Sequence, residues 1–214
     1  MTRNLVTPIA DVVHKDHGGP SGLRRARTAA AALRHASDHG LQVPQVIDVA
    51  GSVLRTATVT DAVNGAMLLA TSPATVLHAV GSIARQLHAL DPPPGFERTV
   101  EGPAAWVHGD LCPVNLLFGA DHVLRAVVDW EDSHVGDPLV DLVWTEWLVR
   151  TWHPTAVEAL PVLYAAYGRT TPQTTARRTA MQRCLTRHRD RDDQATDWDA
   201  HLAALVALDL ELPV

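Results

Sequence analysis

The hydrophobic pattern of the N-terminal quarter predicts a small antiparallel sheet with one helix. Beta-branched residues recur over residues 46–49 and 53–60, which predicts two strands around a glycine-containing turn. A further strand is predicted at residues 10–14. Apolar residues spaced three to four positions apart over residues 21–39 predict a helix that ends at a glycine.

Helical periodicity dominates much of the remaining sequence. Residues 67–90 predict one or two helices, which end at the proline-rich segment 91–95. The apolar pattern of residues 139–168 is helical, another helix begins at residue 179, and residues 198–210 predict an amphipathic closing helix. The chain is therefore expected to have an α+β fold with a mainly helical C-terminal part.

Short apolar runs alternate with loops in the central stretch. The runs at residues 104–107 and 114–118 predict two short buried strands, and residues 109–113 form the loop between them. A third run, residues 124–128, has the composition of a strand and is followed directly by Asp129. The Asp129 carboxylate is expected to emerge at a strand end beside the loop.

Three oxygen-bearing side chains in this stretch have spacings that suit phosphoryl transfer to a hydroxyl. Asp110 is the candidate base that accepts the hydroxyl proton, and Asn115 and Asp129 are candidate magnesium ligands. Magnesium favours such hard oxygen donors and takes only one or two of them from protein. A zinc site is disfavoured, because His108, Asp110 and Cys112 alternate on one short loop without an evident fourth ligand.

Composition limits the classes of function. The chain has 214 residues, 46% of them apolar, which is enough for a proper core in one large or two small domains. A formal net charge of −6 argues against a general nucleic-acid binder. No apolar run approaches the roughly 20 residues of a membrane span, and no signal peptide is evident, so a cytoplasmic protein is expected. Cys112 and Cys184 are expected to be free thiols.

Three motifs together resemble the aminoglycoside phosphotransferase and choline kinase-like superfamily, which is related to the protein kinases. They read HGDLCPVN, VVDWE and GDPLVDL, and they occur in that order. The resemblance implies that Asp110 is the catalytic base, that Asn115 and Asp129 bind Mg²⁺, and that Asp141 is mainly structural. Asp137 is interpreted as the cap of the following helix, which agrees with the proline after it.

The same resemblance implies a protein-kinase-like fold of the aminoglycoside phosphotransferase type. Residues 1–64 would form an antiparallel N-terminal lobe and residues 65–214 a helical catalytic lobe. Lys15 is then the candidate ligand of the phosphates of ATP or GTP, and the backbone near Asp61 and Val63 is the candidate contact of the purine edge. Lys15 can equally be a solvated strand-end lysine, and the segment around Asp61 an ordinary hairpin exit.

Two departures from the family pattern concern the N-terminal lobe. A kinase covers the phosphates with two strands and a glycine-rich loop, but residues 1–14 contain no glycine and are too few for two strands and a loop. The helix stretch 24–33 contains no acid to pair with Lys15, so either another group supplies that acid or the nucleotide is held differently. We therefore expect a truncated lobe that binds nucleotide weakly alone and is completed by a protein partner or a second copy. The expected docking edge lies around residues 12–17 and 53–60.

Three hypotheses for function follow. The first is a nucleotide- and magnesium-dependent phosphotransferase acting on an alcohol group of a small molecule, such as an aminoglycoside-like antibiotic or a metabolite. The second is a partner-dependent kinase of peptide serine or threonine in natural-product biosynthesis. The third is a non-catalytic kinase-like binding or scaffold protein. Intact Asp110, Asn115 and Asp129 favour catalysis, but the sequence does not name the acceptor, the nucleotide or the oligomeric state.

Overall fold

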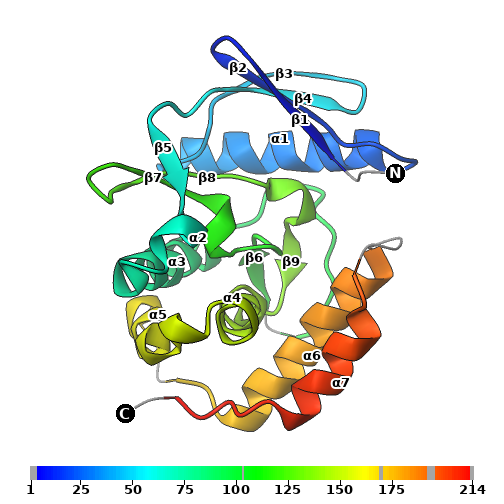
Figure 1. The fold of residues 1–214 in the computed structure, drawn as a ribbon. Helices are drawn as coiled ribbons and strands as arrows, with labels where there is room; N and C mark the ends of the chain where they lie inside the picture. Colours follow the sequence, from blue (N-terminus) through cyan, green and yellow to red (C-terminus); the bar gives the residue numbers. More distant parts are fainter. Residues whose placement is uncertain (1–3, 103, 169–170, 192–195, 213–214) are drawn as a thin grey trace.

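An antiparallel four-stranded sheet forms the N-terminal part of the molecule (Figure 1). The computed structural model describes residues 4–102, 104–168, 171–191 and 196–212. The strand order is β1-β2-β4-β3, and helix α1 packs along the sheet against β3 and β4. The bounds are β1 (Leu5–Ile9), β2 (Val12–Asp16), α1 (Gly22–Asp38), β3 (Val46–Ala50) and β4 (Val53–Ala57).

The pairing of this sheet corrects the docking edge expected from the sequence. Strand β2 pairs with β1 on one side and β4 on the other, and β4 pairs with both β2 and β3. The expected edge, residues 12–17 and 53–60, therefore contains two interior strands. The outer strands are β1 and β3. The sequence pattern did not predict β1, and its antiparallel pairing with β2 corrects the expectation that residues 1–14 are too few for two strands and a loop.

Two smaller sheets carry the central motifs. Strands β5, β7 and β8 form one antiparallel sheet, and β6 pairs with β9 in the other. The strands are β5 (Ala62–Asn64), β6 (Ala105–Val107), β7 (Leu116–Gly119), β8 (Leu124–Val127) and β9 (His134–Gly136). Short 3-10 helices, η1 (Pro113–Asn115) and η2 (Trp130–Asp132), lie just before β7 and shortly after β8.

Helices make up most of the C-terminal part, as predicted (Figure 1). Helix α3 packs along α5, while α4 packs on α6 and α6 on α7. They are α2 (Gly65–Leu68), α3 (Pro73–His88), α4 (Leu139–Trp152), the 3-10 helix η3 (Pro154–Ala159), α5 (Leu160–Tyr167), α6 (Thr174–Arg191) and α7 (Trp198–Ala207). Within the described residues, none of these helices combines the length and the apolar character that a membrane crossing requires.

Two apolar cores hold these layers together. The larger core joins the alanine-rich face of α1 to α3, α5 and strands β6, β7 and β8, and the smaller one lies between α4, α6 and α7. Burial of apolar surface of this kind is the main driving force for folding. The central motifs lie where the two cores meet, so their loops are supported from both sides.

Candidate active site

The loop that follows β6 is fixed by one buried carboxylate. Asp141 on α4 is fully buried and accepts hydrogen bonds from the backbone N–H groups of His108 and Gly109, at 2.9 Å each. His88 of α3 binds Asp141 at 3.0 Å and the hydroxyl of Tyr167 at 3.0 Å. Burial alone would raise the pKa of Asp141, but His88 and the backbone donors lower it below its usual value. Asp141 therefore holds the loop in place as a carboxylate.

Gly109 allows the loop to turn close to the next motif. Its φ of +84° is in the left-handed region, and a side chain there would collide with the backbone of Asp132. The loop and η2 therefore approach each other at backbone distance. This approach brings Asp110 to the vicinity of the acidic residues that follow β8.

Asp110 is held by donors on both of its carboxylate oxygens. The indole Nε1 of Trp144 donates to Oδ1 at 2.6 Å, and Nδ2 of Asn115 donates to Oδ2 at 3.1 Å. Burial, assisted by the negative charge of Asp132, raises the pKa of Asp110 to about 7, and the two donors partly oppose that rise. A fixed carboxyl group with a pKa near neutrality is chemically suited to accept a proton from a hydroxyl.

A backbone hydrogen bond links the segments that carry Asn115 and Asp129. The N–H of Val128 donates to the carbonyl of Asn115 at 2.9 Å, and the ring of His108 binds the carbonyl of Val128 at 3.0 Å. Asp129 follows with a φ of 74°, a conformation that is uncommon and strained for a residue other than glycine. The amide nitrogen of Asn115 is engaged by Asp110, which leaves its Oδ1 as the oxygen donor for a cation.

The donor chemistry of this pair fits magnesium. Within the described part of the chain, no cluster of three or more His, Cys, Asp or Glu side chains could hold a metal by itself. Magnesium does not need such a cluster, because it keeps several waters and takes phosphate oxygens as further ligands. One carboxylate, Asp129, and one amide oxygen, from Asn115, are a sufficient protein contribution.

Lys15 meets the site from strand β2. Its ammonium group forms ion pairs with Asp129 and with Glu131, and 15% of its side chain is exposed. The sequence-predicted lysine and the predicted metal ligand Asp129 are thus neighbours. Glu131 was not predicted as a site residue, although it lies within the VVDWE motif. Burial opposes ionisation of Glu131, but Lys15 and Asn4 outweigh that effect and lower its pKa.

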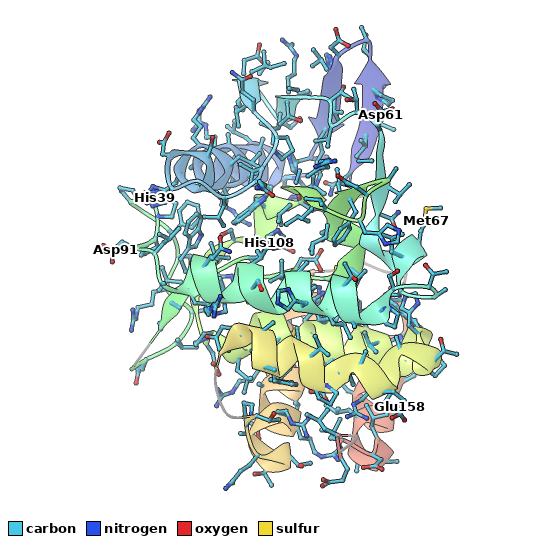
Figure 2. All side chains as sticks on the ribbon, turned by 90° about the vertical axis from the view of Figure 1, so that its left-hand side faces the viewer. His39, Asp61, Met67, Asp91, His108 and Glu158 are labelled. Atoms are coloured by element: carbon cyan, nitrogen blue, oxygen red, sulfur yellow. The ribbon has the colours of Figure 1, made fainter. Side chains whose placement is uncertain are left out.

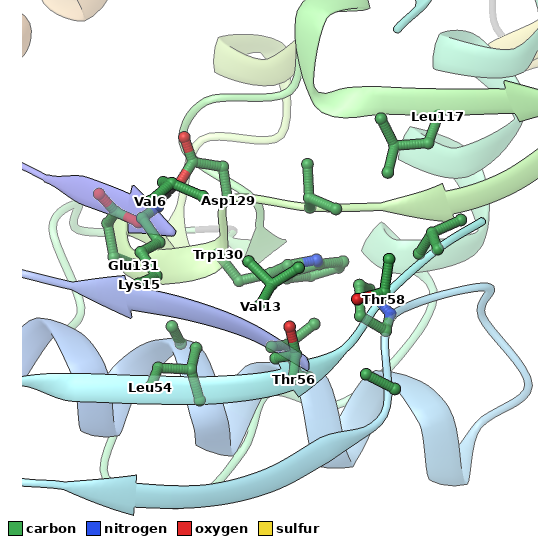
Figure 3. Close-up of a pocket in the computed structure, with 16 residues that line it drawn as sticks. Val6, Val13, Lys15, Leu54, Thr56, Thr58, Leu117, Asp129, Trp130 and Glu131 are labelled. Atoms are coloured by element: carbon green, nitrogen blue, oxygen red, sulfur yellow. Dashed lines mark hydrogen bonds and ion pairs between the residues drawn. The ribbon is translucent and has the colours of Figure 1, made fainter. Parts of the chain in front are cut away.

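A cavity of about 300 Å³ lies between the N-terminal sheet and the second sheet. Figure 3 shows Lys15, Asp129 and Glu131 near one end and Thr58 towards the other, with Trp130 between them. Its apolar walls include Val6, Val13, Ala29, Leu33, Leu54, Leu117 and Trp130. An apolar slot with charged groups at one end has the form of a small-molecule site, and its volume is at the lower end of the usual range of about 300–1,000 Å³.

Asp61 and Val63, whose backbone is the predicted purine contact, do not line this cavity. Asp61 is exposed, lies in the N-terminal part in Figure 2, and lines an outer groove that shares Pro44, Ala57, Thr58 and Val59 with the cavity. Val63 is in β5, where it pairs with Phe118. Thr58 and Val59 line the cavity. They follow the end of β4 at Ala57, which comes three residues earlier than the sequence pattern suggested.

Trp144, which donates to Asp110, belongs to a cluster of aromatic rings buried in the smaller core. Trp144 stacks on His188 with ring centroids 4.1 Å apart and on Trp147 at 5.3 Å. Glu146, next to these tryptophans, is fully buried and binds Arg150, Arg177 and the Tyr164 hydroxyl. Its carboxylate is ion-paired with Arg150 and Arg177, so Glu146 does not offer a free acid to a cationic ligand.

One stretch of the chain matches a known protein family. Residues 94–178 match the family model described as "Phosphotransferase enzyme family". No curated protein sequence matches the chain at a significant level. The matched segment contains Asp110, Asn115, Asp129 and Asp141.

Solved structures show the same fold at low sequence identity. A choline/ethanolamine kinase family protein from Mesorhizobium loti has a TM-score of 0.65 and 20% identity, over 97% of this chain and 84% of that chain. Aminoglycoside phosphotransferase APH(3'')-Id from Streptomyces rimosus, in complex with ADP and streptomycin, has a TM-score of 0.66 and 16% identity, over 82% and 89%. Macrolide 2'-phosphotransferase from Brachybacterium faecium has a TM-score of 0.61 and 19% identity, over 98% and 93%.

The fold is therefore the protein-kinase-like α+β fold of the aminoglycoside phosphotransferases, with an antiparallel N-terminal sheet and a helical C-terminal part. Within that fold, residues 94–178 match the phosphotransferase enzyme family model. The resemblance predicted from the three motifs is confirmed.

Proposed function

We propose that the chain is a nucleotide- and magnesium-dependent phosphotransferase that acts on a hydroxyl group of a small molecule. The observation that carries this proposal is the convergence of Asp110, Asn115 and Asp129 beside a cavity that contains Lys15. A scaffold protein has no chemical need for a partly buried base, an oriented amide and a lysine-paired carboxylate together. Catalysis is therefore favoured over a pure binding role.

The cavity supports the choice of a nucleotide as phosphoryl donor. A purine fits between the apolar walls, with the backbone near Thr58 and Val59 at its edge and Lys15 towards its phosphates. Two related folds support this choice, since one neighbour was solved in complex with ADP and another, APH(2'')-Ib, was solved ADP-bound. Both ATP and GTP are consistent with contacts made by backbone groups.

The residues of the chain divide the reaction between them. Asp110 accepts the proton of the acceptor hydroxyl. The hydroxyl oxygen bonds to the γ-phosphorus as the bond from that phosphorus to the nucleoside diphosphate breaks. Lys15 neutralises phosphate charge, and Trp144 and Asn115 keep the Asp110 carboxyl group in a single orientation. Asn115 and Asp129 would hold Mg²⁺, which neutralises the negative charge of the phosphates when it is bound.

The acceptor class is inferred as a hydroxylated small molecule. The related folds include proteins described as choline kinase, aminoglycoside phosphotransferase and macrolide phosphotransferase, whose named compounds share little besides a hydroxyl group.

Nucleotide binding with and without magnesium tests the proposal. We expect Asp129→Ala to lose the magnesium-dependent part of the affinity for ATP or GTP, because the carboxylate would link the cation to the phosphates. Asp121→Ala is the matched control, since Asp121 is an exposed carboxylate in the turn between β7 and β8. Equal magnesium dependence in the parent and in Asp129→Ala would contradict the assignment. Absence of any nucleotide binding by the parent would contradict the proposed function.

A further inference from the structure

Glu131 lies at the centre of a buried cluster of basic and amide groups. Only 5% of the residue is exposed. Its Oε1 accepts a hydrogen bond from Nδ2 of Asn4 at 2.6 Å, and its Oε2 is paired with the ammonium group of Lys15. The ring Nδ1 of His17 is 3.7 Å from Oε2. Both carboxylate oxygens thus hold groups from the N-terminal sheet: Asn4 directly precedes β1, and Lys15 lies in β2.

Helix α1 contributes a positively charged side chain to this region, where a kinase-like site needs a carboxylate to pair with the lysine. Arg25 is 6% exposed, donates to the carbonyl of Gly18 at 2.6 Å, and contacts Oδ1 of Asn4 at 3.5 Å. Asn4 in turn binds Glu131. The one acid of α1 is Asp38, an exposed residue in its last turn. The carboxylate for the lysine therefore comes from the segment after Asp129.

We infer that Glu131 is the positioning residue that orients Lys15 towards the nucleotide, and that Asn4 and Arg25 fix Glu131 in turn. The inference rests on the proposed function. It resolves the alternative left open by the sequence, because another group does supply the acid that the helix lacks. The charges are inverted relative to the expected pattern: the helix presents Arg25 and the VVDWE segment presents the acid.

The ammonium group of Lys15 is paired with two carboxylates, so it stays paired when one of them binds another group. Lys15 binds both Asp129 and Glu131. When Asp129 turns to a cation, Glu131 still holds the ammonium group, so Lys15 keeps its direction and its buried surroundings stay neutralised. An ammonium group fixed in advance loses less conformational entropy on binding phosphate than a free one.

A double-mutant cycle on nucleotide affinity tests the inference. The probe is the magnesium complex of a non-hydrolysable ATP analogue, and the variants are Glu131→Gln, Lys15→Met and the two combined. We expect Glu131→Gln to weaken binding about tenfold in the parent background, which corresponds to about 1.4 kcal/mol. The same substitution should have little effect once Lys15→Met is present, because Glu131 acts through Lys15. Equal and additive losses in both backgrounds would overturn the inference and assign Glu131 a direct contact with the ligand.

A second readout needs no nucleotide. In the free protein, Glu131→Gln should make Lys15 react several times faster with an amine-modifying reagent, measured by mass spectrometry of the Lys15 peptide. Glu158→Gln is the matched control, because Glu158 is exposed on η3, does not line the cavity, and lies in the helical part of the molecule in Figure 2. An unchanged Lys15 rate in folded Glu131→Gln would overturn the positioning role. If the parent binds no nucleotide at all, the proposed function fails, while this rate still decides whether Glu131 holds Lys15.

Discussion

The indole N–H of Trp144 donates a hydrogen bond to Oδ1 of Asp110 over 2.6 Å, across 34 positions of the chain. Trp144 belongs to α4 and is 6% exposed, so its ring is fixed by the packing of the smaller core. The candidate base is thereby tied to the helical part of the molecule as well as to its own loop. The orientation of Asp110 depends on this helix.

Removing that hydrogen bond should reduce turnover without impairing nucleotide binding. Trp144→Phe keeps an aromatic ring next to His188 and Trp147 but removes the donor. Hydrogen bonds to charged groups are worth about 1.5–3 kcal/mol, so we expect kcat to fall by roughly ten- to a hundredfold. Steady-state kinetics of parent and variant provide the measurement. Trp152→Phe, at an exposed position, is the control and should match the parent.

Stability should depend on the protonation of His17. This ring is fully buried, and burial lowers its pKa from 6.5 to about 4; the charges of Lys15 and Arg25 act in the same direction, and those of Glu131 and Asp16 oppose it. Between these two values the unfolded chain binds more protons than the folded one. The free energy of unfolding should therefore fall as the pH decreases from about 6.5 to about 4.

The contribution of His17 can be isolated with a side chain that does not titrate. In His17→Leu the decrease of the free energy of unfolding across that pH interval should be shallower, as measured by urea denaturation at several pH values. His78→Leu, at an exposed position of α3, should keep the slope of the parent. Identical slopes for the parent and His17→Leu would show that His17 does not govern this part of the acid response.

The contact between α3 and α5 should be intolerant of a single methyl group. A Cβ at Gly81 would overlap the carbonyl oxygen of Leu163 and crowd Ala166. Glycine to alanine normally stabilises a helix by about 1 kcal/mol, yet overpacking costs about 1–3 kcal/mol. We expect Gly81→Ala to lower the midpoint of thermal unfolding, whereas His78→Ala on the exposed side of α3 should change it little. A higher midpoint for Gly81→Ala would refute this packing argument.

Much of the fold was predictable because its signals are local. The helical periodicity of residues 21–39 and the apolar runs around the HGDLCPVN motif correspond to α1, β6, β7 and β8. Strand β1 was not predicted, since Pro8 interrupts its five residues. Proline is tolerated there because β1 is an edge strand, which does not need every backbone N–H for pairing. The edge position of β1 was therefore not visible in the pattern either.

The parts of the site that the sequence did not indicate depend on distant contacts. Glu131 meets Lys15 across 116 positions, and neither residue carries a local sign of the other. Thr58 and Val59, which follow the end of β4, line the cavity, and the end of a strand is its least predictable feature. The roles of Asp110, Asn115 and Asp129 and the need for a partner to complete the N-terminal lobe stay predictions.

Transfer of the γ-phosphate by the parent and by Asp110→Asn tests the central claim most directly. The assay follows labelled phosphate from ATP or GTP to a panel of hydroxylated small molecules, with magnesium present. The account predicts transfer by the parent and a rate roughly 10²–10⁴-fold lower for Asp110→Asn, with nucleotide affinity nearly unchanged. Full activity of the Asp110→Asn variant in this assay would contradict the account.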